Sequence, residues 1–271
     1  MSRLRLFLLG TPQLELEGTA VELDRRKAVA LLAYLAVTAR PHHRDALATL
    51  FWPELDQSRA RAALRRTLSA LNIALAGDWL AADRETIKLK RGPDLWLDVE
   101  QFQTLRTAGQ SHDHPANEVC ADCLAALTEA AALYRADLLA GFTLPDSPDF
   151  DEWHFFEAEK LRRDLAGALE RLVTGLAARA DYQAALAYAR RWQQLDPLHE
   201  PAHRWLMQLY ASTGQRAAAL RQYQECERIL AEELGVAPSA ETAALYERIR
   251  TGGGSRDAEV QRSRGLGGRG A

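Results

Sequence analysis

The sequence predicts a mainly α-helical fold with a small β component, in which a winged helix-turn-helix domain is followed by an all-α, tetratricopeptide-like helical-repeat domain. Two observations predict this fold. Short alternating segments, three helical segments and a hairpin follow one another in the first hundred residues, and a repeat with a period of 34 residues occupies the second half. We therefore expect domains at residues 1–97 and 98–250, and a disordered Gly/Arg-rich tail at 251–271.

The N-terminal segments predict short strands and then two helices. Leucines alternate with other residues at 4–8 and 14–16, which indicates a small antiparallel sheet. Residues 25–37 change to helical periodicity directly after Asp24, a candidate N-cap. A second, shorter helix is expected at 43–51.

A third helix and a hairpin complete the first domain. The helix opens at Ser58, and four leucines at helical spacing form one apolar stripe: Leu64, Leu68, Leu71 and Leu75. Residues 79–82 and 86–90 are two extended segments joined by a short turn. This order is typical of a winged helix, whose third helix enters the DNA major groove while the hairpin wing lies along the backbone.

The charges of the third helix favour DNA binding. Between Ser58 and Ala76 there are four arginines and no acidic residue. The candidate DNA-contacting residues are Ser58, Arg59, Arg61, Ala62, Arg65, Arg66 and Ser69 on the helix, and Lys88, Lys90 and Arg91 in the wing. The alternative is a solvated amphipathic helix. DNA binding is preferred because it also explains the order of the elements.

The two halves of the chain differ in charge. Residues 1–100 hold 15 Lys and Arg against 13 Asp and Glu, a net charge of +2. The remaining residues hold 19 against 24, a net charge of −5. A mildly basic half is thus joined to an acidic half, which suits a nucleic-acid contact in the first half rather than the second.

The second half contains the repeat. Residues 180–185 align with 214–219, so that Trp192 falls on Cys226. Because two repeats do not bury a core alone, helices expected at 120–139 and 150–178 should complete the stack. The repeat predicts a packing scaffold with a groove for a partner.

The sequence lacks the motifs of several enzyme classes and the features of membrane-spanning and disulfide-rich proteins. The sequence has no Gly-Lys pair for a phosphate-binding loop, no G-x-S-x-G and no H-E-x-x-H. We therefore expect no enzyme activity and no cofactor. No apolar run is long enough to span a bilayer, and three cysteines do not form a disulfide framework. The expected location is the cytoplasm, in association with the nucleoid and without a membrane partner.

One cluster has ligand types that could hold zinc. His112 and His114 precede Cys120 and Cys123, and two thiolates with two imidazoles can complete a tetrahedral site. The alternative is that Cys123 packs on a helix while the histidines lie in a loop. We prefer this alternative and predict no metal, because no second matching pair is present elsewhere.

Longer motifs resemble a known family along residues 1–250. Those of the first domain are Asp24-Arg25-Arg26-Lys27-Ala28, Leu50-Phe51-Trp52-Pro53-Glu54, Ala62-Ala63-Leu64-Arg65-Arg66-Thr67-Leu68-Ser69 and Leu97-Asp98-Val99-Glu100-Gln101-Phe102. Those of the second are Leu133 to Phe142, Glu152-Trp153, Asp196 to Arg204 and Glu233 to Ser239. They resemble the SARP (AfsR-type) bacterial transcriptional regulators, in which an OmpR-type winged helix precedes a bacterial transcriptional activator domain.

The resemblance implies a transcriptional activator that binds promoter DNA as a homodimer and recruits RNA polymerase. One departure is that Ala70, Asn72 and Ile73 stand where the family's recognition helix is usually rich in arginine. Two alternatives stay open. The chain could be a protein-binding adaptor with a degenerate winged helix, or the N-terminal regulatory part of a larger signalling NTPase.

Overall fold

The computed structural model describes residues 3–77, 79–108 and 119–252. These residues form two compact units. The first comprises the described residues up to Ala108 together with Glu129–Leu165, and the second comprises residues 119–128 together with the described residues from Ala166 onward.

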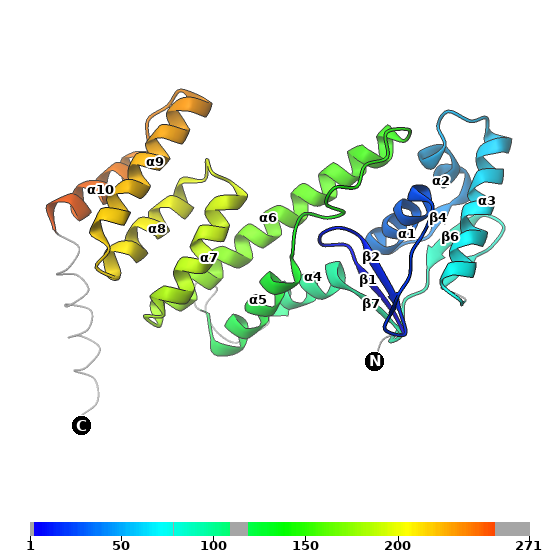
Figure 1. Ribbon diagram of the computed structural model, residues 1–271, viewed down its shortest axis with the longest axis horizontal. Coiled ribbons are helices and arrows are strands. Elements are labelled where there is room, and N and C mark those ends of the chain that lie inside the picture. Colours follow the sequence, from blue (N-terminus) through cyan, green and yellow to red (C-terminus); the bar gives the residue numbers. More distant parts are fainter. Residues whose placement is uncertain (1–2, 78, 109–118, 253–271) are drawn as a thin grey trace. The chain divides into compact units, whose positions relative to one another are not determined.

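Two small sheets frame the first unit (Figure 1). The first has the strand order β3-β2-β1-β7, with β1 (Leu4–Phe7), β2 (Gln13–Leu16), β3 (Thr19–Ala20) and β7 (Leu95–Leu97). The expected antiparallel pairing of the N-terminal strands is present, whereas β7 lies parallel to β1. The second sheet is the wing, in the order β4-β6-β5, with β4 (His42–His43), β5 (Leu80–Ala82) and β6 (Thr86–Leu89).

Three helices form the helix-turn-helix part: α1 (Arg26–Thr38), α2 (Arg44–Phe51) and α3 (Gln57–Ala74). The prediction that Asp24 caps α1 is wrong. The N-cap is Arg25, whose backbone is extended, and the amide of Ala28 donates to the Arg25 carbonyl at 2.9 Å. Helix α1 therefore begins one residue too late for the Asp24 side chain to stand at the N-cap. No side chain caps its first turn.

A buried carboxylate joins the first strand to the helix that follows the wing. Asp98, the first residue of α4 (Asp98–Ala108), accepts hydrogen bonds from the amides of Leu8 at 2.9 Å and Leu9 at 2.8 Å. Burial raises the pKa of Asp98, while these amides and the nearby Arg135 oppose the rise. The carboxylate thereby satisfies two backbone donors that would otherwise be buried without partners.

The segment after α5 (Ala121–Leu133) belongs to the same compact unit as the winged helix. The expected helix at 120–139 ends at Leu133, because the following residues bond to the chain after β1. Leu138 forms a β-bridge with Leu9, and the Leu139 amide donates to the Leu8 carbonyl at 2.8 Å. These bonds replace the helical ones.

An aromatic cluster holds the start of α6 (Pro148–Ala178) against α1 and α2. The ring of Phe150 lies 5.5 Å from Phe51 and 5.4 Å from Trp153, measured between centroids. Trp153 in turn lies 4.7 Å from Tyr34 of α1, edge to face. This side of the winged helix is therefore covered by its own chain.

The second unit contains the 34-residue repeat. It pairs α7 (Tyr182–Leu195) with α8 (Glu200–Ser212) and α9 (Arg216–Leu234) with α10 (Ala240–Thr251), as Figure 1 shows. Ala180 and Gly214, which are 34 residues apart, both have positive φ and end the preceding helix. The aligned Trp192 and Cys226 are 3% and 1% exposed. The repeat in the sequence is thus a repeat in the packing.

Candidate nucleic-acid interface

Helix α3 separates an apolar face from a basic one. The carboxylate of Asp56 caps it by accepting from the amides of Ser58 and Arg59, both at 3.1 Å. The predicted stripe is buried: Leu64, Leu68, Leu71 and Leu75 are between 0% and 7% exposed. The stripe fixes the rotation of the helix, so that its polar residues turn to solvent.

Most of the predicted contact residues of α3 lie on its solvent face. Ser58, Arg59, Arg65, Arg66 and Ser69 are exposed, and Ala62 is half-buried. Arg59 stays near the N-cap, with its Nε 3.3 Å from the Asp56 carboxylate. Within the described part of the chain, neither Arg65 nor Arg66 forms an ion pair. Both guanidinium groups are therefore available to an external anion.

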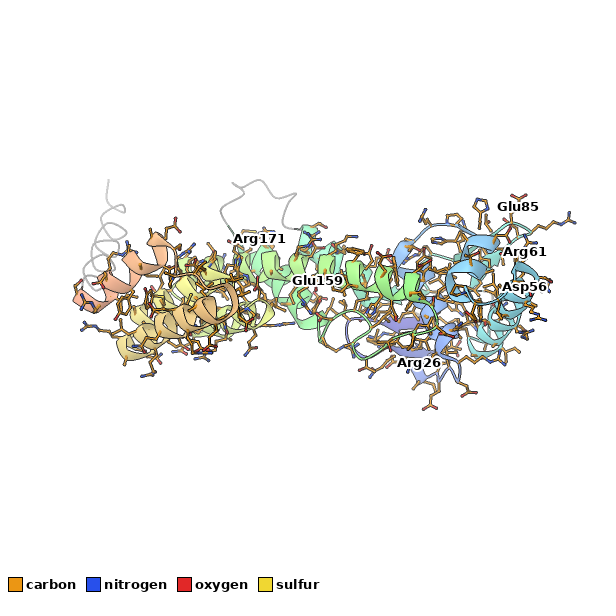
Figure 2. The ribbon with its side chains drawn as sticks, turned by 90° about the horizontal axis from the view of Figure 1, so that it is seen from above. Arg26, Asp56, Arg61, Glu85, Glu159 and Arg171 are labelled. Carbon is orange, nitrogen blue, oxygen red and sulfur yellow. The ribbon has the colours of Figure 1, made fainter. Side chains whose placement is uncertain are left out.

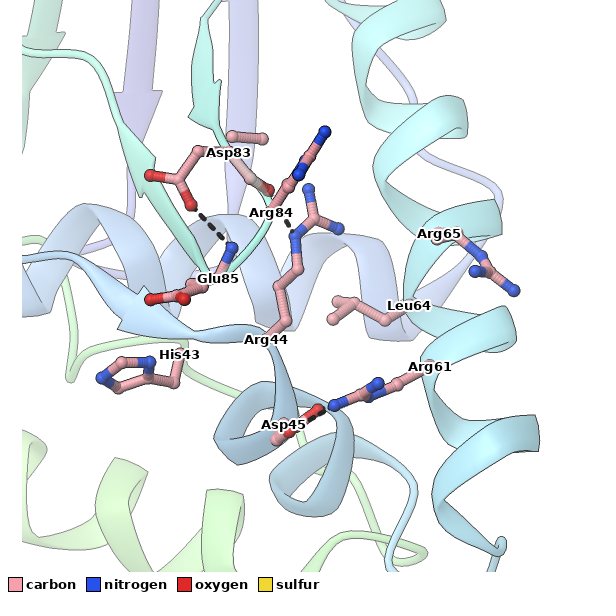
Figure 3. Close-up of a pocket in the computed structure, with 10 residues that line it drawn as sticks. His43, Arg44, Asp45, Arg61, Leu64, Arg65, Asp83, Arg84 and Glu85 are labelled. Atoms are coloured by element: carbon pink, nitrogen blue, oxygen red, sulfur yellow. Dashed lines mark hydrogen bonds and ion pairs between the residues drawn. The ribbon is translucent and has the colours of Figure 1, made fainter.

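Arg61 has a partner within the protein. Its Nη2 donates to Asp45 of α2 at 2.5 Å, and its Nε donates to the other carboxylate oxygen, so the contact is bidentate. The hydrogen bond from Arg61 holds the pKa of Asp45 below its usual value. This pair links α2 to α3 at the surface, as Figure 3 shows, and Figure 2 labels Arg61 on the ribbon of the whole chain. A phosphate would have to compete with Asp45 for this arginine.

The tip of the wing is held by one aspartate. The Asp83 carboxylate accepts from the amides of Glu85 at 2.7 Å and Thr86 at 2.6 Å. These hydrogen bonds hold the pKa of Asp83 below its usual value. Arg44, the first residue of α2, donates to the Asp83 carbonyl at 2.8 Å. The turn that carries Arg84 is thus tied to α2.

The three predicted wing residues have different surroundings. Lys88 is exposed on β6, opposite Ala81. Lys90 is half-buried after β6, and its amide donates to the Trp79 carbonyl at 2.8 Å. Arg91 donates to Glu100 of α4 at 2.5 Å and to the Ala36 carbonyl of α1. Lys88 therefore faces solvent, whereas Arg91 joins the base of the wing to two helices.

A hollow of about 750 Å³ lies between α3, the start of α2 and the tip of the wing. Its lining includes four arginines: Arg44, Arg61, Arg65 and Arg84 (Figure 3). Three carboxylates, of Asp45, Asp83 and Glu85, also line it, so its formal charge is +1. Sequence reasoning did not select Arg44 and Arg84, because their proximity to α3 depends on how the hairpin folds back onto α2.

The C-terminal half of α3 presents different chemistry. Asn72 is exposed, and Ile73 is 77% exposed although it is a large apolar side chain. A smaller hollow of about 300 Å³, lined in part by Ala70, Ile73 and Ala74, lies beside it. Here an amide and an apolar side chain stand at positions where the resembled family usually carries arginine.

The cysteines belong to the second compact unit, whereas these arginines belong to the first. The sulfurs of Cys120 and Cys123 are 3.4 Å apart. His112 and His114 fall outside the described residues. Among the residues that are described, no three His, Cys, Asp or Glu side chains gather closely enough to hold a metal ion. In the same residues, no helix is long and apolar enough to cross a membrane.

Comparison with known proteins identifies the family. Residues 97–250, more than half of the chain, match the bacterial transcriptional activator domain. The chain belongs to this family. It is 29% identical over 261 residues to the transcriptional regulatory protein EmbR of Mycobacterium tuberculosis, covering 91% of this chain and 63% of the relative. The predicted resemblance to SARP-type transcription regulators is thereby confirmed.

Two further relatives and one solved structure agree. The chain is 25% identical to the transcriptional regulatory protein MoaR1 of M. tuberculosis, covering 89% of this chain and 78% of the relative. It is 28% identical to the regulatory protein AfsR of Streptomyces griseus, covering 81% of this chain but 22% of the relative. M. tuberculosis EmbR in complex with a low-affinity phosphopeptide matches with a TM-score of 0.71 and 27% identity, covering 93% of this chain and 66% of that one. The predicted fold class is confirmed.

Proposed function

We propose that this chain is a transcriptional regulator that binds double-stranded promoter DNA through α3 and the wing. The observation that carries the proposal is the polar face of α3, where Arg65 and Arg66 are exposed, have no ion-pair partner among the described residues, and lie on a helix without acidic residues. Phosphate oxygens and the O6 and N7 atoms of guanine are the anionic and acceptor groups that such arginines bind.

The remaining residues of the interface would contact either the DNA backbone or the bases. Arg44 and Arg84 line the hollow beside α3, and Lys88 is exposed on the wing, where cations suit the DNA backbone. Small exposed residues such as Ser58 and Ser69 let the helix approach the bases closely. At the C-terminal end of α3, the side-chain amide of Asn72 would donate to N7 of adenine and accept from its N6 amino group, and Ile73 has the apolar surface that a thymine methyl group contacts.

The helical repeat would serve assembly rather than catalysis. Stacked helix pairs provide a surface for a second copy of the chain or for RNA polymerase. The net charge of −5 after residue 100 disfavours a second DNA site there. We propose a homodimer on direct repeats, with no cofactor, no catalytic activity and the domain limits 1–97 and 98–250. The chain spans 63% of the length of its EmbR relatives. Regulation of transcription by the whole protein is therefore part of this proposal.

Selection of genomic fragments by the purified protein tests the proposal. We expect enrichment of fragments that share a sequence and lie near promoters. The variant with both Arg65→Ala and Arg66→Ala should enrich none, whereas Arg221→Ala with Arg228→Ala, which removes two exposed arginines from α9, should enrich the same fragments. No enrichment by the folded wild-type protein would refute DNA recognition and favour the protein-binding adaptor.

A further inference from the structure

Two thiols lie together at the start of α5. Cys120 directly precedes the helix and Cys123 is in its first turn. Their sulfurs are 3.4 Å apart, and the Cys123 amide donates to the Cys120 sulfur, also at 3.4 Å. A disulfide bond needs about 2.05 Å, so a small rotation of the side chains would bring the sulfurs to bonding distance.

The two thiols differ in their access to solvent. Cys120 is partly exposed, whereas Cys123 is 0% exposed. Burial raises the pKa of the Cys123 thiol, and the charge of Arg171 only partly opposes this rise. Cys120 directly precedes the first turn of α5, where its sulfur accepts the hydrogen bond from the Cys123 amide. An accessible attacking thiol thus stands beside a shielded second thiol.

Residues that flank the two thiols pack closely on α6. At Gly175 of α6, an added Cβ would lie 2.8 Å from the Cβ of Val119 and 3.0 Å from Cδ2 of Leu124. The turn that carries the thiols is therefore in direct contact with the α6 backbone. A reagent from solvent can reach Cys120 first, because Cys120 is partly exposed whereas Cys123 is buried.

The geometry points to a redox-active dithiol at Cys120 and Cys123 that exchanges with small disulfides such as oxidised glutathione. The Cys120 thiolate attacks one sulfur of glutathione disulfide, and one glutathione thiolate leaves. The Cys123 sulfur then attacks the Cys120 sulfur of the mixed disulfide, and its proton passes to the departing glutathione sulfur. The second glutathione leaves as its thiol, and the first thiolate takes up the proton that Cys120 had lost to water. The dithiol is thus oxidised by two electrons, and glutathione disulfide is reduced to two thiols.

Glutathione buffers of increasing oxidised fraction, applied to the full chain, test this inference. After acid quenching, intact mass and peptide mapping should show one Cys120–Cys123 disulfide and the loss of two hydrogen atoms. Cys123→Ser should stop at a glutathione adduct on Cys120. Cys120→Ser should form neither product because Cys123 is buried. Cys226→Ser is the control, since Cys226 is buried in the repeat, and it should react as the wild type does.

Circular dichroism shows whether each variant is folded, and Cys123→Ala replaces Cys123→Ser if the serine variant is not. The inference is overturned if the folded wild type forms no Cys120–Cys123 disulfide in fully oxidised buffer. It is equally overturned if glutathione adds to Cys226 as fast as to Cys120, or if the purified chain holds one tightly bound zinc ion that prevents oxidation. DNA binding takes no part in these measurements, so their outcome is independent of the proposed function.

Discussion

Helices α3 and α9 are nearly equal in length and both carry several arginines, yet their polar faces differ. Helix α3 has four arginines and no acidic residue in 18 residues. Helix α9 has three arginines and four glutamates in 19 residues. In α9, Arg228 is paired with Glu225 at 2.7 Å and with Glu232 at 2.5 Å, so its charge is neutralised on its own helix.

The comparison shows that the number of arginines does not define a candidate DNA surface. What matters is whether a guanidinium group already has an internal partner. Arg65 and Arg66 have none among the described residues, whereas Arg228 has two and Arg61, although it lies on α3, has Asp45. DNA binding by arginine variants and its dependence on salt test this distinction, whereas a leucine pair and Glu200 test how the two units are stabilised.

The double variant Arg65→Ala and Arg66→Ala should lose about 2–6 kcal/mol of binding free energy for its selected DNA, because each arginine supplies a groove or phosphate contact. Fluorescence anisotropy with a labelled duplex measures the loss. The matched variant, Arg221→Ala with Arg228→Ala in α9, should bind as the wild type does. Equal losses in both variants would mean that total charge, rather than the α3 face, governs binding.

The apolar faces of α3 and α9 should respond alike. Leu68 of α3 and Leu230 of α9 are 7% and 3% exposed. Leu68→Ala and Leu230→Ala should each lower the free energy of unfolding of their unit by roughly 2–5 kcal/mol through the cavity left behind. Urea unfolding followed by circular dichroism measures this. A change below about 1 kcal/mol at Leu68 would contradict the anchoring role of the stripe.

The salt dependence of DNA binding should distinguish free from paired cations. Lys88→Ala should reduce the slope of log affinity against log salt by about 0.9, the value of one phosphate contact. Asp45→Asn should raise the slope by about 0.9 if releasing Arg61 adds one such contact. Lys160→Ala, at an exposed residue of α6, is the control and should leave the slope unchanged. An unchanged slope for Asp45→Asn would show that Arg61 is too far from the DNA phosphates to contact them.

The smallest expected effect concerns the stability of the helical repeat at low pH. Glu200 of α8 accepts from the Ser239 amide at 2.9 Å and from the hydroxyl groups of Ser239 and Thr242 at the start of α10. Burial tends to raise its pKa, but these hydrogen bonds and Arg204 together hold the pKa below its usual value.

Because the folded-state pKa of Glu200 is depressed, its contribution to stability is present above the unfolded-state pKa. It is lost as the pH falls through the folded-state pKa. Glu200→Gln should therefore lower the melting temperature at neutral pH and flatten its fall in acid. Calorimetric scans at a series of pH values measure both effects. If the melting temperatures of wild type and variant fall in parallel as the pH is lowered, another carboxylate accounts for the acid sensitivity.

Much of the local structure could be predicted because it depends on neighbours in the sequence. The leucine spacing of α3 gave its buried face, and the turn residues gave the hairpin. The 34-residue offset gave the equivalence of Trp192 and Cys226. The limits of α1 and α5 were less predictable. Arg25 rather than Asp24 precedes α1, and α5 ends at Leu133 because Leu138 and Leu139 bond to the first strand segment.

The sequence by itself determined the fold class, the family and the excess of positive charge on α3, because periodicity, motif and net charge are properties of order and composition. Only the tertiary structure decided which cations are available. Asp45 engages Arg61 across two helices, Glu100 engages Arg91 from beyond the wing, and the hairpin turn brings Arg84 beside α3. Ion pairs form only between groups within about 4 Å, and that proximity is created by folding.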